Sequence, residues 1–164
     1  MREIDAGLIT KEVKRLEANY FLPDDVLNSL KESKKNEEWD LASATIGKII
    51  DNAEIASTDH APMCQDTGMV VVFVKMGQDV RITNGYIEDA INQGIREGYT
   101  EGYLRKSVVS DPLNRVNTKD NTPGIIHYEI VPGDKLSIMV APKGFGSENM
   151  SRIKMLKGFC IGIC

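Results

Sequence analysis

The feature that most constrains the fold is the uncharged run Met69–Val74, which is rich in valine and lies between Gly68 and Gly77. Such a β-branched run is typical of a buried strand. No uncharged apolar run in the chain is longer, and this one is far shorter than the ~20 residues that cross a bilayer. The run therefore predicts a sheet in the middle of the chain, and other elements must cover it.

Helical periodicity precedes this strand. The first predicted helix places Val13, Leu16 and Tyr20 on one face, a second begins at Asp24, and a third runs from about 37 to 57. The third has the i, i+3, i+4, i+7 spacing of an amphipathic helix, so we expect its apolar face to meet a core. That face consists of Trp39, Ala42, Ile46, Ile49, Ile50 and Ala53.

A fourth helix is expected at about 84–103, where Gly94, Gly98 and Gly102 recur at every fourth position. Each glycine costs a soluble helix ~1 kcal/mol relative to alanine. We therefore expect these positions to allow the close approach of another backbone.

Two further strands, Ile125–Val131 and Leu136–Val140, flank the short turn Pro132–Lys135, which is typical of a hairpin. A last helix is expected to begin near Ser147. This order predicts an α+β fold in which N-terminal helices pack on a small mixed or antiparallel sheet with further helices. The 164 residues correspond to about one domain.

Charge and composition exclude several classes of protein. The net charge is −4 and the pI about 5.3, so there is no strong positive field for nucleic acid. Hydrophobic residues make up 41% and charged residues 27%, as in soluble globular domains. The first residues form no apolar signal core, and the three cysteines are an odd number. We expect a cytoplasmic protein that binds neither nucleic acid nor membrane.

Three segments carry the groups that do chemistry. Thr58–Gly68 contains a thiol, an imidazole, an amide and carboxylates. Leu104–Gly124 is long and aperiodic, and its Arg105 and Lys106 suit carboxylate binding. Lys143–Ser151 begins with glycines before a helix, where backbone N–H groups can meet a small anion. Each segment also has a purely structural interpretation: the first is a loop that ends a helix, the second carries surface cations, and the third is a plain helix cap. Together the segments predict a site for a small di-anionic acid beside a cysteine-bound metal centre.

At the same segments the chain resembles the α part of class I, iron–sulfur-dependent fumarate hydratases, a family that includes tartrate dehydratase α subunits. The matching strings are PMCQDTG (62–68), LRKSVVSDPLNRVNTKDNTPGIIH (104–127) and KGFGSENMSRIKML (143–156). The resemblance covers nearly all of residues 1–157. It implies a hydro-lyase that removes water from a 2-hydroxy dicarboxylic acid, or adds it back to fumarate or a related acid. It also implies a [4Fe–4S] cluster held by three cysteines, whose open iron acts as a Lewis acid.

Carried onto this sequence, the resemblance implies that Cys64 is the first cluster ligand and Asp66 the candidate acid–base group. Substrate contacts are implied for Gln65, Arg105 and a backbone N–H of Gly144 or Gly146. Supporting roles fall to Thr67, Lys106, Asn121 and Lys143, and His127 is expected to be a structural residue in a buried run.

The resemblance ends after Leu156, and residues 158–164 are expected to be an atypical tail. Cys160 and Cys164 are therefore not carried over as ligands, although their i, i+4 spacing leaves a metal role open. We expect the other cluster cysteines to come from the remainder of the α part, and further substrate-binding cations from a β subunit. The isolated chain is expected to be folded, colourless, inactive and homo-oligomeric.

Two alternatives to a hydro-lyase part stay open at the level of sequence. In the first alternative the chain is a catalytically silent assembly module. In the second it is a mononuclear metal protein that uses His60, Cys64 and Asp66.

Overall fold

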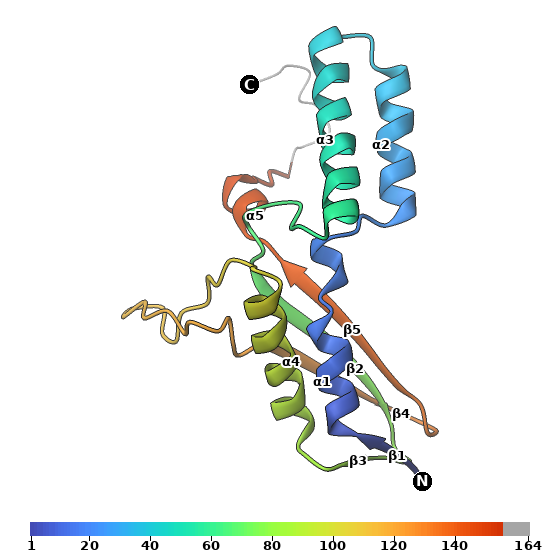
Figure 1. The fold of residues 1–164 in the computed structure, drawn as a ribbon, viewed down its shortest axis with the longest axis vertical. Helices are drawn as coiled ribbons and strands as arrows, with labels where there is room; N and C mark the ends of the chain where they lie inside the picture. Colours follow the sequence, from blue (N-terminus) through green and yellow to red (C-terminus); the bar gives the residue numbers. More distant parts are fainter. Residues whose placement is uncertain (156–164) are drawn as a thin grey trace.

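The structure is a computed structural model that describes residues 1–155 (Figure 1). The fold combines helices with two small sheets, which confirms the expected α+β class. None of the helices in this range is long and apolar enough to cross a membrane. The elements are β1 (Arg2–Asp5), α1 (Ala6–Lys14), the 3-10 turn η1 (Glu17–Asn19), α2 (Asp24–Asn36), α3 (Asp40–Asp59), β2 (Met69–Gly77), β3 (Val80–Thr83), α4 (Ile87–Glu101), β4 (Ile125–Val131), β5 (Leu136–Lys143) and α5 (Gly146–Met150).

The valine-rich strand β2 is the central strand of a three-stranded mixed sheet with the order β4-β2-β5. It pairs in parallel with β4 and antiparallel with β5. The expected hairpin is therefore wrong, because β2 lies between the two strands that the turn Pro132–Lys135 connects. Pairing on both edges gives the backbone N–H and C=O groups of this buried strand hydrogen-bond partners, which burial requires.

One face of this sheet forms the core with α1 and α4 (Figure 1). Val70 and Val72 of β2 are fully buried, as are Ile91 and Ile95 of α4. The close approach predicted for the glycines of α4 is confirmed, since a Cβ atom on Gly94 would lie 2.7 Å from the carbonyl oxygen of Thr10 in α1.

The opposite face of the sheet is exposed in the described part of the chain. Phe73 and Met139, which are register partners on β2 and β5, are 46% and 64% exposed. The His127 ring stacks on Phe73 with a centroid distance of 5.3 Å. His127 is thus exposed, contrary to the expectation of a buried run, because alternate residues of a strand point to opposite faces.

Helices α2 and α3 form an antiparallel pair that extends away from the sheet (Figure 1). The predicted apolar face of α3 is partly covered: Ala53 is buried, whereas Trp39, which precedes the helix, is 64% exposed and Ile49 is 47% exposed. The expectation that this face meets a core is confirmed only in part within residues 1–155, where α2 is the main neighbour of α3.

The N-terminal region differs from the prediction in two further ways. α1 ends at Lys14, and Leu16 adopts a left-handed backbone with φ 43° before the 3-10 turn. Strands β1 and β3 were not expected from the sequence, and they form a separate two-stranded parallel sheet.

Candidate active site

The first predicted segment is the loop between α3 and β2. Its first residue, His60, has φ 53° and ends α3 in a left-handed conformation. The His60 ring stacks on Tyr20 with a centroid distance of 4.4 Å. Within residues 1–155, no group of three His, Cys, Asp or Glu side chains is placed to hold a metal ion. The mononuclear alternative with His60, Cys64 and Asp66 therefore has no geometric support there.

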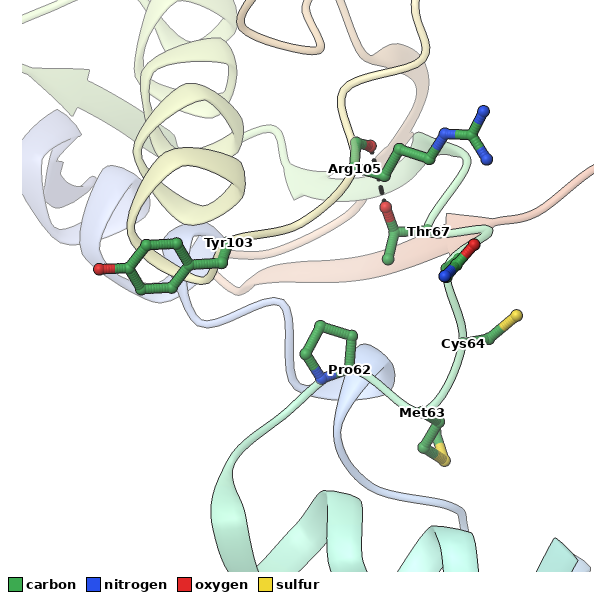
Figure 2. Close-up of a pocket in the computed structure, with 7 residues that line it drawn as sticks. Pro62, Met63, Cys64, Thr67, Tyr103 and Arg105 are labelled. Carbon is green, nitrogen blue, oxygen red and sulfur yellow. Dashed lines mark hydrogen bonds between the residues drawn. The ribbon is translucent and has the colours of Figure 1, made fainter.

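The remainder of this loop borders a pocket of about 680 Å³. Cys64 is exposed at the pocket, and the N–H of Asp66 donates to its Sγ at 3.4 Å. In Figure 2 the Arg105 side chain and the Cys64 thiol lie on the same side of the loops, while Tyr103 extends the other way. Four predicted site residues thus share one pocket, whose lining is Pro62, Met63, Cys64, Gln65, Thr67, Tyr103 and Arg105.

A hydrogen bond joins the first predicted segment to the second. The buried Thr67 donates its hydroxyl to the carbonyl oxygen of Arg105 at 2.9 Å (Figure 2). This bond spans 38 sequence positions and sets the base of the Arg105 side chain beside the Cys64 loop. The exposed guanidinium has five N–H donors in a planar fork that suits a carboxylate.

Asn121 links the same two segments from inside the protein. It is fully buried and has φ 63°. Its Oδ1 accepts the N–H groups of Ser107 and Val108 at 2.7 and 3.1 Å, and its Nδ2 donates to the carbonyl of Gly68 at 2.9 Å. A buried amide with each of these bonds satisfied specifies one geometry for the loops around it.

The third predicted segment meets the first through Asp66. Its Oδ2 accepts the N–H of Phe145 at 3.0 Å and that of Gly146 at 2.9 Å. The Gly146 N–H, one of two that were expected to face a substrate carboxylate, is thus directed to Asp66. The two bonds orient the carboxylate at the start of α5.

Gly68 allows the end of β5 to approach the start of β2. Its φ is +59°, a left-handed conformation that favours glycine, and a Cβ atom there would collide with the carbonyl of Lys143. The turn from the Cys64 loop into β2 therefore depends on glycine at this position.

The two predicted supporting lysines do not line the pocket. The carbonyl of Lys106 accepts a hydrogen bond from the Asn117 amide at 2.9 Å. Lys143 places its Nζ 5.5 Å from the centroid of the Phe145 ring. Both lysines belong to predicted site segments, but their side chains are outside the pocket lining.

An ion pair anchors the far end of the second segment to α4. Arg96 donates to the Asp120 carboxylate at 2.8 Å. Burial alone would raise the pKa of Asp120, but hydrogen bonds from Arg96 and Thr122 outweigh it and lower that pKa to about 2. The carboxylate therefore stays charged at neutral pH and holds the loop.

Two tyrosines at the site were not predicted from the sequence. Tyr99 is fully buried, and its hydroxyl donates to the carbonyl of Thr67 at 2.6 Å. Burial raises the pKa of this hydroxyl well above its usual value, so it remains a donor. Tyr103 lines the pocket and has φ 54°. The sequence does carry a signal for Tyr99, which continues the four-residue spacing of Ile91 and Ile95 and so falls on the buried face of the helix. A buried tyrosine hydroxyl requires a hydrogen-bond partner.

Some of the residues discussed from the sequence lie outside the described range. Cys160, Cys164 and the expected tail 158–164 follow residue 155, the last that the structure describes.

Comparisons with known proteins identify relatives of this chain. A “Putative L(+)-tartrate dehydratase subunit alpha” from Methanocaldococcus jannaschii is 40% identical over 147 residues, which are 86% of this chain and 51% of that protein. The L(+)-tartrate dehydratase subunit alpha of Escherichia coli UTI89 is 34% identical over 144 residues, 82% of this chain and 45% of that protein. The anaerobic class I fumarate hydratase of Escherichia coli K12 is 36% identical over 104 residues, 62% of this chain and 19% of that protein.

The chain thus spans about half the length of the tartrate dehydratase subunits that it matches. A family model described as fumarate hydratase (Fumerase) matches residues 10–160, which include every predicted site residue and most of the chain. The chain belongs to the fumarate hydratase family.

Proposed function

We propose that the chain is part of an iron–sulfur hydro-lyase that interconverts a small 2-hydroxy dicarboxylic acid with the unsaturated acid plus water. The substrate class is fumarate and malate, or tartrate. The observation that carries the proposal is the convergence of Cys64, Gln65 and Arg105 on one pocket, with Asp66 oriented beside them. Family membership supports the same reaction class.

Substrate binding is assigned to the polar groups that border the pocket. The Arg105 guanidinium offers a planar fork to one carboxylate, and the Gln65 amide offers a further donor. Gly144 is the glycine that remains for a backbone contact to the substrate, because Gly146 donates to Asp66. These donors suit a di-anion and leave an uncharged acid poorly bound.

The proton chemistry is assigned in part to Asp66. Elimination breaks a C–O bond and the neighbouring C–H bond, the C–H electron pair becomes the double bond, and the hydroxyl takes a proton and leaves as water. Asp66 carries out one of these two proton transfers, and a group outside the described residues carries out the other. The N–H groups of Phe145 and Gly146 keep its carboxylate in one orientation.

The chemistry of Cys64 fits an iron–sulfur cluster. Its thiol is exposed at the pocket beside Arg105, and thiolates are the ligands such clusters take. Residues 1–155 contain one cysteine, so the other ligands lie elsewhere in the protein. When bound, the cluster supplies Lewis-acid stabilisation of the charge that develops on the departing hydroxyl.

Exposed apolar surfaces support assembly with further chains. Phe73 and Met139 occupy the open sheet face, and Trp39 and Leu41 lie at the start of α3. We propose that a β subunit and a second copy of the protein cover such surfaces, since uncovered apolar patches favour association. The same observation favours the alternative of a catalytically silent assembly module.

Anaerobic co-production of the chain together with the remainder of the α part and the β subunit, followed by iron and sulfide determination and assays with fumarate, malate and L-tartrate, tests the proposal. We expect cluster incorporation and turnover of at least one of these acids. An iron-loaded complex that turns over none of them would contradict the hydro-lyase and leave the assembly module as the better description.

A further inference from the structure

We infer that Tyr99 is a positioning residue of the proposed active site. Its buried hydroxyl holds the backbone at Thr67 and thereby sets the position of Asp66 relative to Arg105. The inference rests on the function proposed above, because Asp66 and Arg105 act on a substrate only in that proposal.

The hydroxyl of Tyr99 contacts the residues that directly follow Asp66. It donates to the carbonyl of Thr67 at 2.6 Å, and the carbonyl of Gly68 lies 3.4 Å away. Tyr99 is 0% exposed and lies on α4, whose Ile95 packs in the core. The donor is thus carried by a rigid helix, whereas its acceptors belong to a loop that bears the site residues.

Two further hydrogen bonds connect Thr67 and Gly68 to the segment that contains Arg105. Thr67 donates its hydroxyl to the Arg105 carbonyl at 2.9 Å, and Asn121 donates to the Gly68 carbonyl at 2.9 Å. Of the hydrogen bonds to the carbonyls of Thr67 and Gly68, the bond from the Tyr99 hydroxyl to Thr67 is the shortest. Tyr99 therefore connects α4 to the junction at which the two site loops meet.

Loss of the Tyr99 hydroxyl leaves a buried carbonyl without its donor, which is unfavourable. The loop at Thr67 then shifts to find another donor and carries Asp66 with it. Catalytic geometry is sensitive to such shifts, because a misplacement of about 1 Å lowers rates by up to about 10²-fold.

The first test compares Tyr99→Phe with Ile91→Val in the assembled, iron-loaded protein. Ile91 is fully buried on the same helix and makes no polar contact, so its variant loses stability without disturbing the loop. We expect Tyr99→Phe to lower kcat by about 10-fold to 100-fold with a much smaller change in KM and unchanged iron content. Ile91→Val keeps the normal kcat. Thr67→Val, which removes the link to Arg105, lowers kcat as Tyr99→Phe does.

The second test is hydrogen exchange by mass spectrometry, which does not depend on activity. We expect peptides covering 62–68 and 104–108 to exchange about tenfold faster in Tyr99→Phe, while peptides from 70–76 are unchanged. Ile91→Val gives no such local increase. Equal behaviour of the two variants in exchange and in kcat would overturn the positioning role. Absence of hydro-lyase activity in the unsubstituted protein would instead refute the proposed function, and the exchange comparison would still decide the role of Tyr99.

Discussion

Asp66 and Gly146 lie 80 positions apart in the sequence, and the Gly146 N–H donates to Oδ2 of Asp66 at 2.9 Å. The Phe145 N–H donates to the same oxygen at 3.0 Å. These bonds hold the loop before β2 against the turn after β5. They also make the role of Asp66 testable, because an asparagine at this position can accept the same hydrogen bonds without the charge of the carboxylate.

Asp66→Asn tests the proton-transfer role. The amide oxygen of Asn still accepts from Phe145 and Gly146, so the turn keeps its geometry. We expect kcat of the assembled enzyme to fall by about 10²-fold or more, the usual contribution of a general acid or base. Iron content and the visible spectrum stay unchanged. Asp79→Asn, at the exposed β2–β3 turn, is the control and keeps normal turnover.

Cys64→Ser tests the cluster ligand. A serine hydroxyl is a poor ligand for iron compared with a thiolate, so we expect loss of iron, sulfide and visible absorbance from the assembled protein. Met63→Leu, at the neighbouring position of the pocket lining, should retain all three. A stable cluster in Cys64→Ser would remove Cys64 from the ligand set.

Arg105→Lys tests the substrate carboxylate contact. Lysine keeps the positive charge and loses the two-pronged donor geometry, so we expect KM to rise about tenfold with a smaller effect on kcat. Arg115→Lys makes the same chemical change in the same loop but outside the pocket lining, and its kinetics should be normal. Equal KM values for both variants would show that Arg105 does not bind the substrate.

The Asp120–Arg96 pair predicts a pH dependence of stability. The folded pKa of Asp120 lies at about 2, below the ordinary value of 3.8, so its stabilising contribution is complete above about pH 4 and is lost as the pH falls towards 2. The contribution is at most about 1 kcal/mol, because the Arg96 side chain is half exposed. Urea unfolding midpoints should fall less between about pH 5 and pH 3 in Asp120→Asn than in the unsubstituted protein. Asp134→Asn, at an exposed turn, should keep the full decrease.

Gly68→Ala tests the close approach at the start of β2. Gly68 and Gly133 both have positive φ, but a Cβ atom collides with the Lys143 carbonyl only at Gly68, whereas nothing lies within 4 Å at Gly133. Both alanine variants bear conformational strain, and we expect Gly68→Ala to lose a further 1–3 kcal/mol, roughly the cost of overpacking. Thermal unfolding measures the difference. Equal losses would show that the loop moves aside without penalty.

The predictions from sequence succeeded where a pattern is local. The β-branched run predicted β2, and the periodicity around Ile91 and Ile95 predicted α4. They failed where a long-range contact decided the outcome. The turn at Pro132–Lys135 gave no sign that β2 would lie between its two strands. The apolar stripe of α3 likewise carried no information on what would cover it.

The sequence by itself determined the α+β class, the family and the three segments that carry the reactive groups, because side-chain type and periodicity are properties of neighbouring residues. Only the tertiary structure decided that these segments meet. The bonds from Thr67 to Arg105 and from Gly146 to Asp66 join the segments and span 38 and 80 positions, and the bond from Tyr99 to Thr67 joins α4 to the first segment across 32 positions. Each depends on the strand order of the sheet and the packing of α4 against it, because that arrangement brings donors and acceptors from distant parts of the chain within hydrogen-bonding distance.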